Sequence, residues 1–213
     1  MNLFKRKPRP TPDTPIPFGR RCQWLALKGA DTQAVAAALK LRRVMPANWA
    51  TGIEAAYADK IFVSPPLGQW VLAIGVTLPD AGDAHHIDEI TPLLLALSKM
   101  FEEVQYFGSH RVIEYYGWAK ARQGKILRAY AYLGEAGTTL WNRGNKTPAE
   151  VELGFNFFDE ASPAAEDVNY WQRTDLRFPD EEDVLAIAQK WSVDPLFKAQ
   201  RYGPGIGVLG FLK

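Results

Sequence analysis

Apolar and polar positions follow a strand-like pattern most clearly over residues 104–133. Within this stretch, residues 111–119 and 125–133 are mostly β-branched, aromatic or small, and such residues favour extended chain. The segment Arg122-Gln123-Gly124 lies between them and contains the glycine that tight turns between antiparallel strands favour. The pattern therefore predicts a strand from Val104 and then a long hairpin at the centre of a sheet.

Helical spacing is found on both sides of this region. Residues 184–191 place apolar side chains at i, i+3, i+4 and i+7, behind the capping residue Asp180 and a run of acids that suits the start of a helix. Four further helices are predicted where a capping residue precedes an apolar stripe, with Asp31, Thr51, Thr91 and Thr147 as the caps: residues 31–41, 51–57, 91–101 and 147–153.

Shorter strands are predicted over residues 22–28, 61–64, 70–77 and 138–141. Several neighbouring strands are joined by turns too short for a parallel crossover, for example the turn at residues 65–68. The expected fold class is therefore α+β, with a mainly antiparallel sheet, a long central hairpin and about four to five packed helices.

Two segments lack any regular period. Residues 1–18 carry five prolines and several basic side chains, so we expect a flexible tail, or alternatively a basic arm that touches a partner, ahead of a single domain over residues 19–213. Residues 155–179 mix aromatic side chains with acids and prolines, which indicates an irregular and partly packed segment.

Charge and cysteine content narrow the functional classes. The 213 residues include 25 basic and 24 acidic side chains, and this balance gives no general attraction to nucleic acid or to an anionic membrane. The chain contains no run of 18 apolar residues that would predict a membrane-spanning helix. Cys22 is the single cysteine and fits a reducing compartment, so we expect a cytoplasmic protein.

Motifs that carry chemistry are few. The glycines of residues 205–210 match G-x-G-x-x-G, but too few residues follow for the helix that would hold a pyrophosphate. The loop His85-His86-Ile87-Asp88-Glu89 lacks the usual spacing of metal ligands, and Ser109-His110 lacks a nucleophile elbow. We therefore predict no catalytic residue, no metal and no cofactor, and expect a protein that is not an enzyme.

Aromatic and charged residues of the predicted hairpin are the candidate site. On a flat face they would suit a protein interface, because Tyr, Trp and Arg are enriched at binding hot spots. In a sheet cleft, Glu114, His110 and Arg128 would instead form a ligand pocket or active site. A third interpretation is a face covered by a helix, with Glu and Arg at its rim. The partner-binding candidates are Glu114, Tyr115, Tyr116, Trp118, Arg128 and Tyr130.

A family resemblance supports the protein-interface interpretation. The segments Gly68-Gln-Trp-Val-Leu-Ala-Ile-Gly75 and Glu102-Glu-Val-Gln-Tyr-Phe-Gly-Ser-His-Arg111 resemble uncharacterised bacterial proteins and are similar to immunity proteins of polymorphic toxin systems. The resemblance implies a cytoplasmic protein that binds and occludes a cognate toxin, without a cofactor and with no family site residues to carry over. The resemblance implies no particular oligomeric state for this protein.

The charge balance departs from the strongly acidic pattern of inhibitors of basic nucleases, so the toxin need not be a nuclease. Acidic runs do occur locally, at residues 159–160, 166–167 and 180–183. Such runs could bind a basic partner, or they could be solvated loops and acids that cap a helix.

Overall fold

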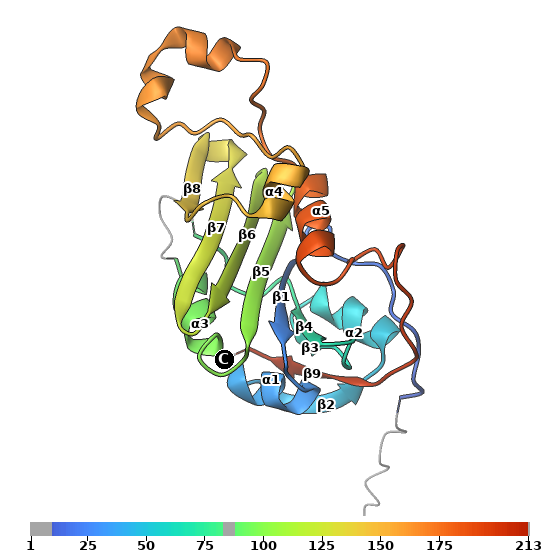
Figure 1. The fold of residues 1–213 in the computed structure, drawn as a ribbon. Helices are drawn as coiled ribbons and strands as arrows, with labels where there is room; N and C mark the ends of the chain where they lie inside the picture. The colour runs from blue at the N-terminus through green and yellow to red at the C-terminus, as the bar shows by residue number, and fades with distance from the viewer. Residues whose placement is uncertain (1–9, 83–87, 213) are drawn as a thin grey trace, which may run out of the picture.

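An antiparallel sheet dominates the fold. The computed structural model describes residues 10–82 and 88–212, and within them nine strands form one sheet. The strand order is β2-β9-β3-β4-β1-β5-β6-β7-β8, and the eight pairings between these strands are all antiparallel (Figure 1). The strands are β1 (Gln23–Lys28), β2 (Arg42–Ala47), β3 (Ile61–Val63), β4 (Trp70–Ile74), β5 (Glu103–His110), β6 (Tyr115–Arg122), β7 (Lys125–Leu133), β8 (Thr138–Arg143) and β9 (Gly207–Phe211).

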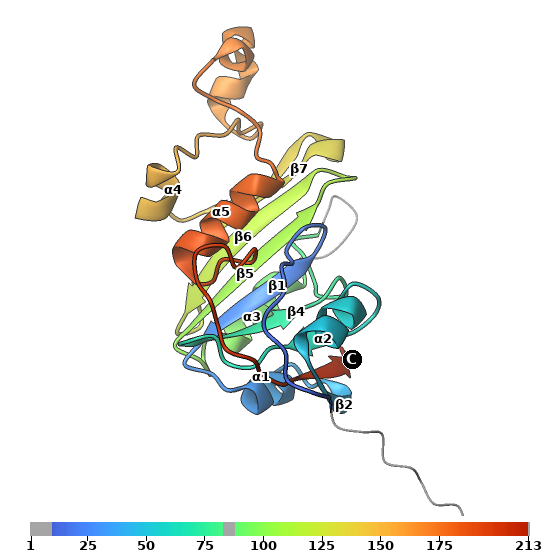
Figure 2. The same ribbon diagram turned by 90° about the vertical axis from the view of Figure 1, so that its right-hand side faces the viewer.

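Helices cover both faces of the sheet, so the domain has three layers (Figure 2). One face is covered by α2 (Trp49–Ala56), α4 (Pro148–Glu152) and α5 (Glu181–Trp191). The other face is covered by α1 (Thr32–Ala38) and α3 (Ile90–Leu97). The expected α+β class with a mainly antiparallel sheet is therefore confirmed.

Strand β1 shows how the sequence fills both layers. Successive side chains of a strand point to opposite faces. Trp24 and Ala26 accordingly lie in the core beneath α2 and α5, whereas Leu25 and Leu27 lie in the core beneath α1 and α3. Because both faces are covered, this strand is apolar at consecutive positions instead of alternating.

The hairpin of β6 and β7 lies elsewhere in the sheet than the sequence pattern predicts. Its two-residue turn is formed by Gln123 and Gly124, both with positive φ, as tight hairpins require. The hairpin lies next to the edge strand β8, while β1 occupies the middle of the sheet. The strand expected over residues 111–119 begins later than predicted, at Tyr115, because residues 111–114 form the turn between β5 and β6.

Two helices begin before their expected caps. Helix α2 begins at Trp49, where the Asn48 side chain caps the backbone and the Asp13 carboxylate accepts from the Trp49 amide at 2.5 Å. Helix α3 begins at Ile90, and the Asp88 carboxylate accepts from the Thr91 amide at 2.9 Å. In both cases an amide or carboxylate acceptor just upstream satisfies the free N–H groups, so the threonine is not needed as a cap.

Part of the expected tail is packed against the domain. Asp13 bridges to Gly205 besides capping α2, and Phe18 is buried in the core. Residues 10–18 therefore belong to the domain, while residues 1–9 of the expected tail lie outside the described residues. Residues 10–18 are held in place by residues distant in sequence, such as Trp49 and Gly205.

Strand β9 explains the glycine motif of residues 205–210. This strand pairs with β2 on one side and β3 on the other. A side chain at Gly207 would overlap the Val63 carbonyl oxygen, and one at Gly210 would press on Leu41. The glycines thus allow close approach of neighbouring backbones, and the motif serves packing.

Candidate functional site

Five of the six candidate residues are buried and form no exposed surface, which corrects the prediction. Helices and the segment that follows α4 cover this part of the sheet, as the third interpretation expects, but Arg128 is buried and does not lie at a rim. Glu114 alone among the six is exposed, and it lies in a turn with φ of 52°. The five buried candidates are Tyr115, Tyr116, Trp118, Arg128 and Tyr130.

Arg128 has a structural partner other than Glu114. Its Nε donates to the Glu150 carboxylate at 2.8 Å, and both side chains are buried. Glu150 also accepts from the Trp118 indole N–H at 3.0 Å and completes the capping box of α4 with Thr147. This buried ion pair therefore joins the hairpin to the start of α4.

The alternative ligand site around Glu114, His110 and Arg128 is not assembled. Tyr115, next to Glu114, pairs with Leu133, whereas Arg128 pairs with Lys120. Leu133 and Arg128 are five residues apart on β7, which is about 17 Å along a strand. His110 lines a hollow of about 440 Å³ beside Tyr57 and Gln23, and neither Glu114 nor Arg128 is among the residues that line it.

Between α4 and α5 the chain leaves the domain as a long projection, hereafter the arm, comprising residues 155–179. The arm extends past the end of the sheet near β7 and β8, and it is the orange segment of Figure 1. It holds two short 3-10 helices, η2 (Pro163–Glu166) and η3 (Val168–Gln172). Irregular loops of this length are uncommon in compact domains and are often functional.

The base of the arm is tied to the domain at Arg177. Backbone hydrogen bonds join its two ends, from the Phe158 amide to the Arg177 carbonyl and from the Arg177 amide to the Asn156 carbonyl, each 3.1 Å. The Arg177 guanidinium donates to the Asp183 carboxylate of α5 at 2.5 and 2.6 Å. It also lies 5.0 Å from the centre of the Phe157 ring. Charge and aromatic contacts thus fix both ends of the arm.

Aromatic contacts continue from the sheet into the arm. The ring centres of Tyr130 and Phe157 are 5.1 Å apart, and those of Tyr132 and Phe178 are 5.4 Å apart. Phe158 stands 5.0 Å from Phe178. Tyr130, predicted to bind a partner directly, therefore helps to hold the arm instead.

The tip of the arm, which comprises η2 and η3, has its own hydrogen bonds. The Asp167 carboxylate caps η3 by accepting from the Asn169 amide at 2.9 Å. The Trp171 indole N–H donates to the Ala165 carbonyl at 3.0 Å. The Tyr170 hydroxyl accepts from the Asp159 amide at 2.7 Å. These contacts give the tip a defined shape without regular secondary structure.

The outer surface of the arm is apolar and acidic. Val168, Trp171 and Phe178 are 69%, 41% and 47% exposed. Residues 155–179 contain five acidic and two basic side chains, for a net charge of −3. None of these three exposed residues was among the predicted candidates, although the aromatic content of a long acidic segment without periodicity was a signal for them.

Carboxylates of the arm also contact the edge strand β8. Glu160 accepts from the Thr139 amide at 2.9 Å and from its hydroxyl at 2.7 Å. The Asn142 side chain donates to Asp159 at 3.0 Å. Burial, with the Glu160 charge, raises the pKa of Tyr132 to about 12, so this phenol stays neutral. The arm thereby occupies part of an edge that could otherwise pair with another strand.

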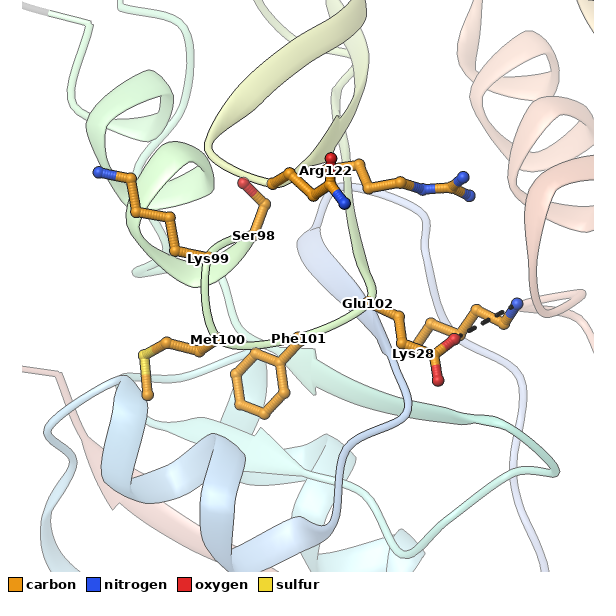
Figure 3. A pocket seen from close by; sticks show the side chains of 8 residues that line it. Lys28, Ser98, Lys99, Met100, Phe101, Glu102 and Arg122 are labelled. Atoms are coloured by element: carbon orange, nitrogen blue, oxygen red, sulfur yellow. Dashed lines mark ion pairs between the residues drawn. The ribbon is translucent and has the colours of Figure 1, made fainter.

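A hollow of about 600 Å³ lies where the residues that follow α3 and the β6–β7 turn meet. Figure 3 shows that Lys99 and Arg122 point in opposite directions there, and that Lys28 is paired with Glu102 at 3.6 Å. The three cations therefore do not converge on one point, and the hollow does not have the polar arrangement of a ligand site.

Residues 10–82 and 88–212 contain no group of three His, Cys, Asp or Glu side chains placed to hold a metal. His85 and His86 lie outside the described residues.

Burial raises the pKa of Cys22 to about 12, which keeps this thiol protonated and unreactive. Across the same described ranges, every helix is too short or too polar to cross a bilayer.

Comparisons with family models, with curated proteins and with solved structures found no match for this chain.

Proposed function

We propose that this protein is an immunity-type binding protein that neutralises a cognate bacterial toxin by occluding it, with the arm as the contact element. The observation that carries the proposal is the arm itself, an ordered projection with exposed Trp171, Phe178 and Val168. Binding residues are often found on loops held by a rigid scaffold. Aromatic side chains are also the commonest anchors of protein interfaces.

The anchoring of the arm supports inhibition by steric occlusion. Arg177 and the aromatic rings at the base already hold the arm in place, so little conformational freedom would be lost on binding. A projection of this kind can enter a cleft of a toxin and exclude its substrate, and no bond needs to be made or broken. We place this activity in the cytoplasm, in a complex of two proteins and without a cofactor.

The experiment that tests this function is co-purification followed by a growth assay. The tagged protein is isolated from its native host, and a partner recovered in stoichiometric amount is expressed alone and together with this chain. We expect the partner to arrest growth alone and to be harmless in co-expression. Recovery of no such partner, or a partner whose toxicity persists in the complex, would overturn the proposal.

A further inference from the structure

The arm differs in charge from the rest of the chain. Its 25 residues carry five acidic and two basic side chains, whereas the other residues carry 19 acidic and 23 basic side chains. Net charges are therefore −3 for the arm and +4 for the remainder. A negative projection is repelled by phosphate backbones and anionic lipids and is attracted to basic protein surfaces.

The exposed apolar side chains of the tip lie on one side of η3. In a 3-10 helix, residues i and i+3 are eclipsed, and Val168 and Trp171 have this spacing. They are 69% and 41% exposed, and the exposed acids Glu166 and Asp167 directly precede them. The tip thus presents one aliphatic and one aromatic side chain beside negative charge.

This arrangement is held before any partner binds. The Trp171 indole N–H is bonded to Ala165 and the start of η3 is capped by Asp167. Because an anchor that is already ordered loses less entropy on binding, such a residue contributes more to affinity. Trp171 therefore meets the structural requirements of an interface anchor.

We infer that η3 inserts Val168 and Trp171 into an apolar pocket of the toxin whose rim carries lysine or arginine side chains. The inference rests on the proposed function and adds the chemistry of the partner surface. The acids of the tip would pair with that basic rim, and the two apolar side chains would fill the pocket.

The test uses the toxin domain recovered by co-purification as the probe. Dissociation constants are measured at low and high salt for wild type, Trp171→Ala, Val168→Ser and Glu166→Lys. Leu127→Ala is the control, because Leu127 is 47% exposed on β7, outside the arm. Circular dichroism confirms that each variant is folded.

We expect Trp171→Ala to weaken binding by roughly 30-fold or more, as hot-spot residues do. Val168→Ser should weaken it less, Glu166→Lys should weaken it and flatten its salt dependence, and Leu127→Ala should bind like wild type. Folded tip variants that all bind like wild type would overturn the inference and leave the proposed function standing.

Other outcomes would reject the inference for different reasons. If no toxin is recovered, the proposed function fails and the inference fails with it. Wild-type binding to duplex DNA or to vesicles of anionic lipid, abolished by Trp171→Ala, would mean a different class of partner. Self-association that depends on Trp171 in size-exclusion chromatography would assign the tip to a second copy of this chain.

Discussion

At the residue scale, Glu150 joins three parts of the structure. Its carboxylate pairs with Arg128 at 2.8 Å, accepts from the Trp118 indole at 3.0 Å and closes the capping box of α4. A buried ion pair often contributes little compared with an apolar replacement of both partners. Removing one partner is different, because the remaining charge is left buried without compensation.

We therefore expect Glu150→Ala to lower the free energy of unfolding by about 3–5 kcal/mol. The matched control is Glu152→Ala on the same helix, because Glu152 pairs with Lys190 at the surface and should contribute less than about 1 kcal/mol. Urea denaturation of the two variants measures the difference. Equal and small losses for both would show that the buried pair does not stabilise the fold.

The Glu103 carboxylate makes the stability of the fold depend on pH. Burial raises the pKa of Glu103, but the hydrogen bond from Gln105 and the charges of Lys120 and Arg122 outweigh it and hold this pKa below 4.5, the ordinary value for an exposed glutamate. A carboxyl with a lowered pKa stabilises the fold above its unfolded value. That stability is lost as pH falls below about 4.5 and through the folded pKa.

Replacing the Glu103 carboxylate should therefore make the free energy of unfolding less sensitive to acid. Glu103→Gln is expected to be less stable than wild type at pH 7, with the difference shrinking below pH 4.5. The control Glu102→Gln removes a carboxylate that is 66% exposed and should leave the pH profile unchanged. Unfolding free energies measured from pH 7 to pH 3 test this, and a constant difference for Glu103→Gln would contradict it.

At the element scale, the two arginines of the arm provide a matched comparison. Arg177 pairs with Asp183 of α5 and contacts Phe157, whereas Arg173 pairs with Asp175 within the arm. Arg177→Ala should therefore free the base of the arm, while Arg173→Ala should not.

The readout is amide hydrogen exchange over residues 156–178 together with limited proteolysis. We expect faster exchange and earlier cleavage in Arg177→Ala, with the thermal midpoint of the domain little changed because the sheet is intact. Equal protection of the arm in both arginine variants would mean that the aromatic contacts alone hold it.

Most elements could be predicted from sequence because their signals are local. Asp31, Thr147 and Asp180 cap helices as predicted, since a side chain and a nearby amide are sufficient for a cap. Strand β2 was missed because it is exposed, basic and contains Pro46, which is tolerated at the edge of a sheet. Its partner β9 is far away in sequence, and no local pattern indicates that pairing.

The candidate site was harder to predict than the elements. Alternation along β6 separates two faces, but it does not say whether a face is covered. Trp118 is buried because residues of α4 and the arm lie on it, and these contacts are long-range. The exposure of the candidate residues therefore depended on segments distant in sequence, such as Phe157 for Tyr130 and Ala81 for Tyr115.

At the scale of the whole molecule, charge and shape are divided between two parts. The arm has a negative net charge, and the rest of the chain, which forms the three-layer domain, has a positive one. The base of the arm packs into the aromatic core of this domain. The division favours a binding protein in which the domain gives rigidity and the arm gives recognition. Removing the arm should then abolish binding while leaving the domain folded.

Whether the arm is the contact element can be measured by replacing residues 160–176 with a short glycine linker, which the hydrogen-bonded base of the arm allows. Affinity for the recovered toxin and protection of growth are compared with those of wild type, after circular dichroism has shown that the shortened protein is folded. We predict a folded protein that neither binds the toxin nor protects growth. A folded, shortened protein that binds and protects like wild type would show that the arm is not the contact element.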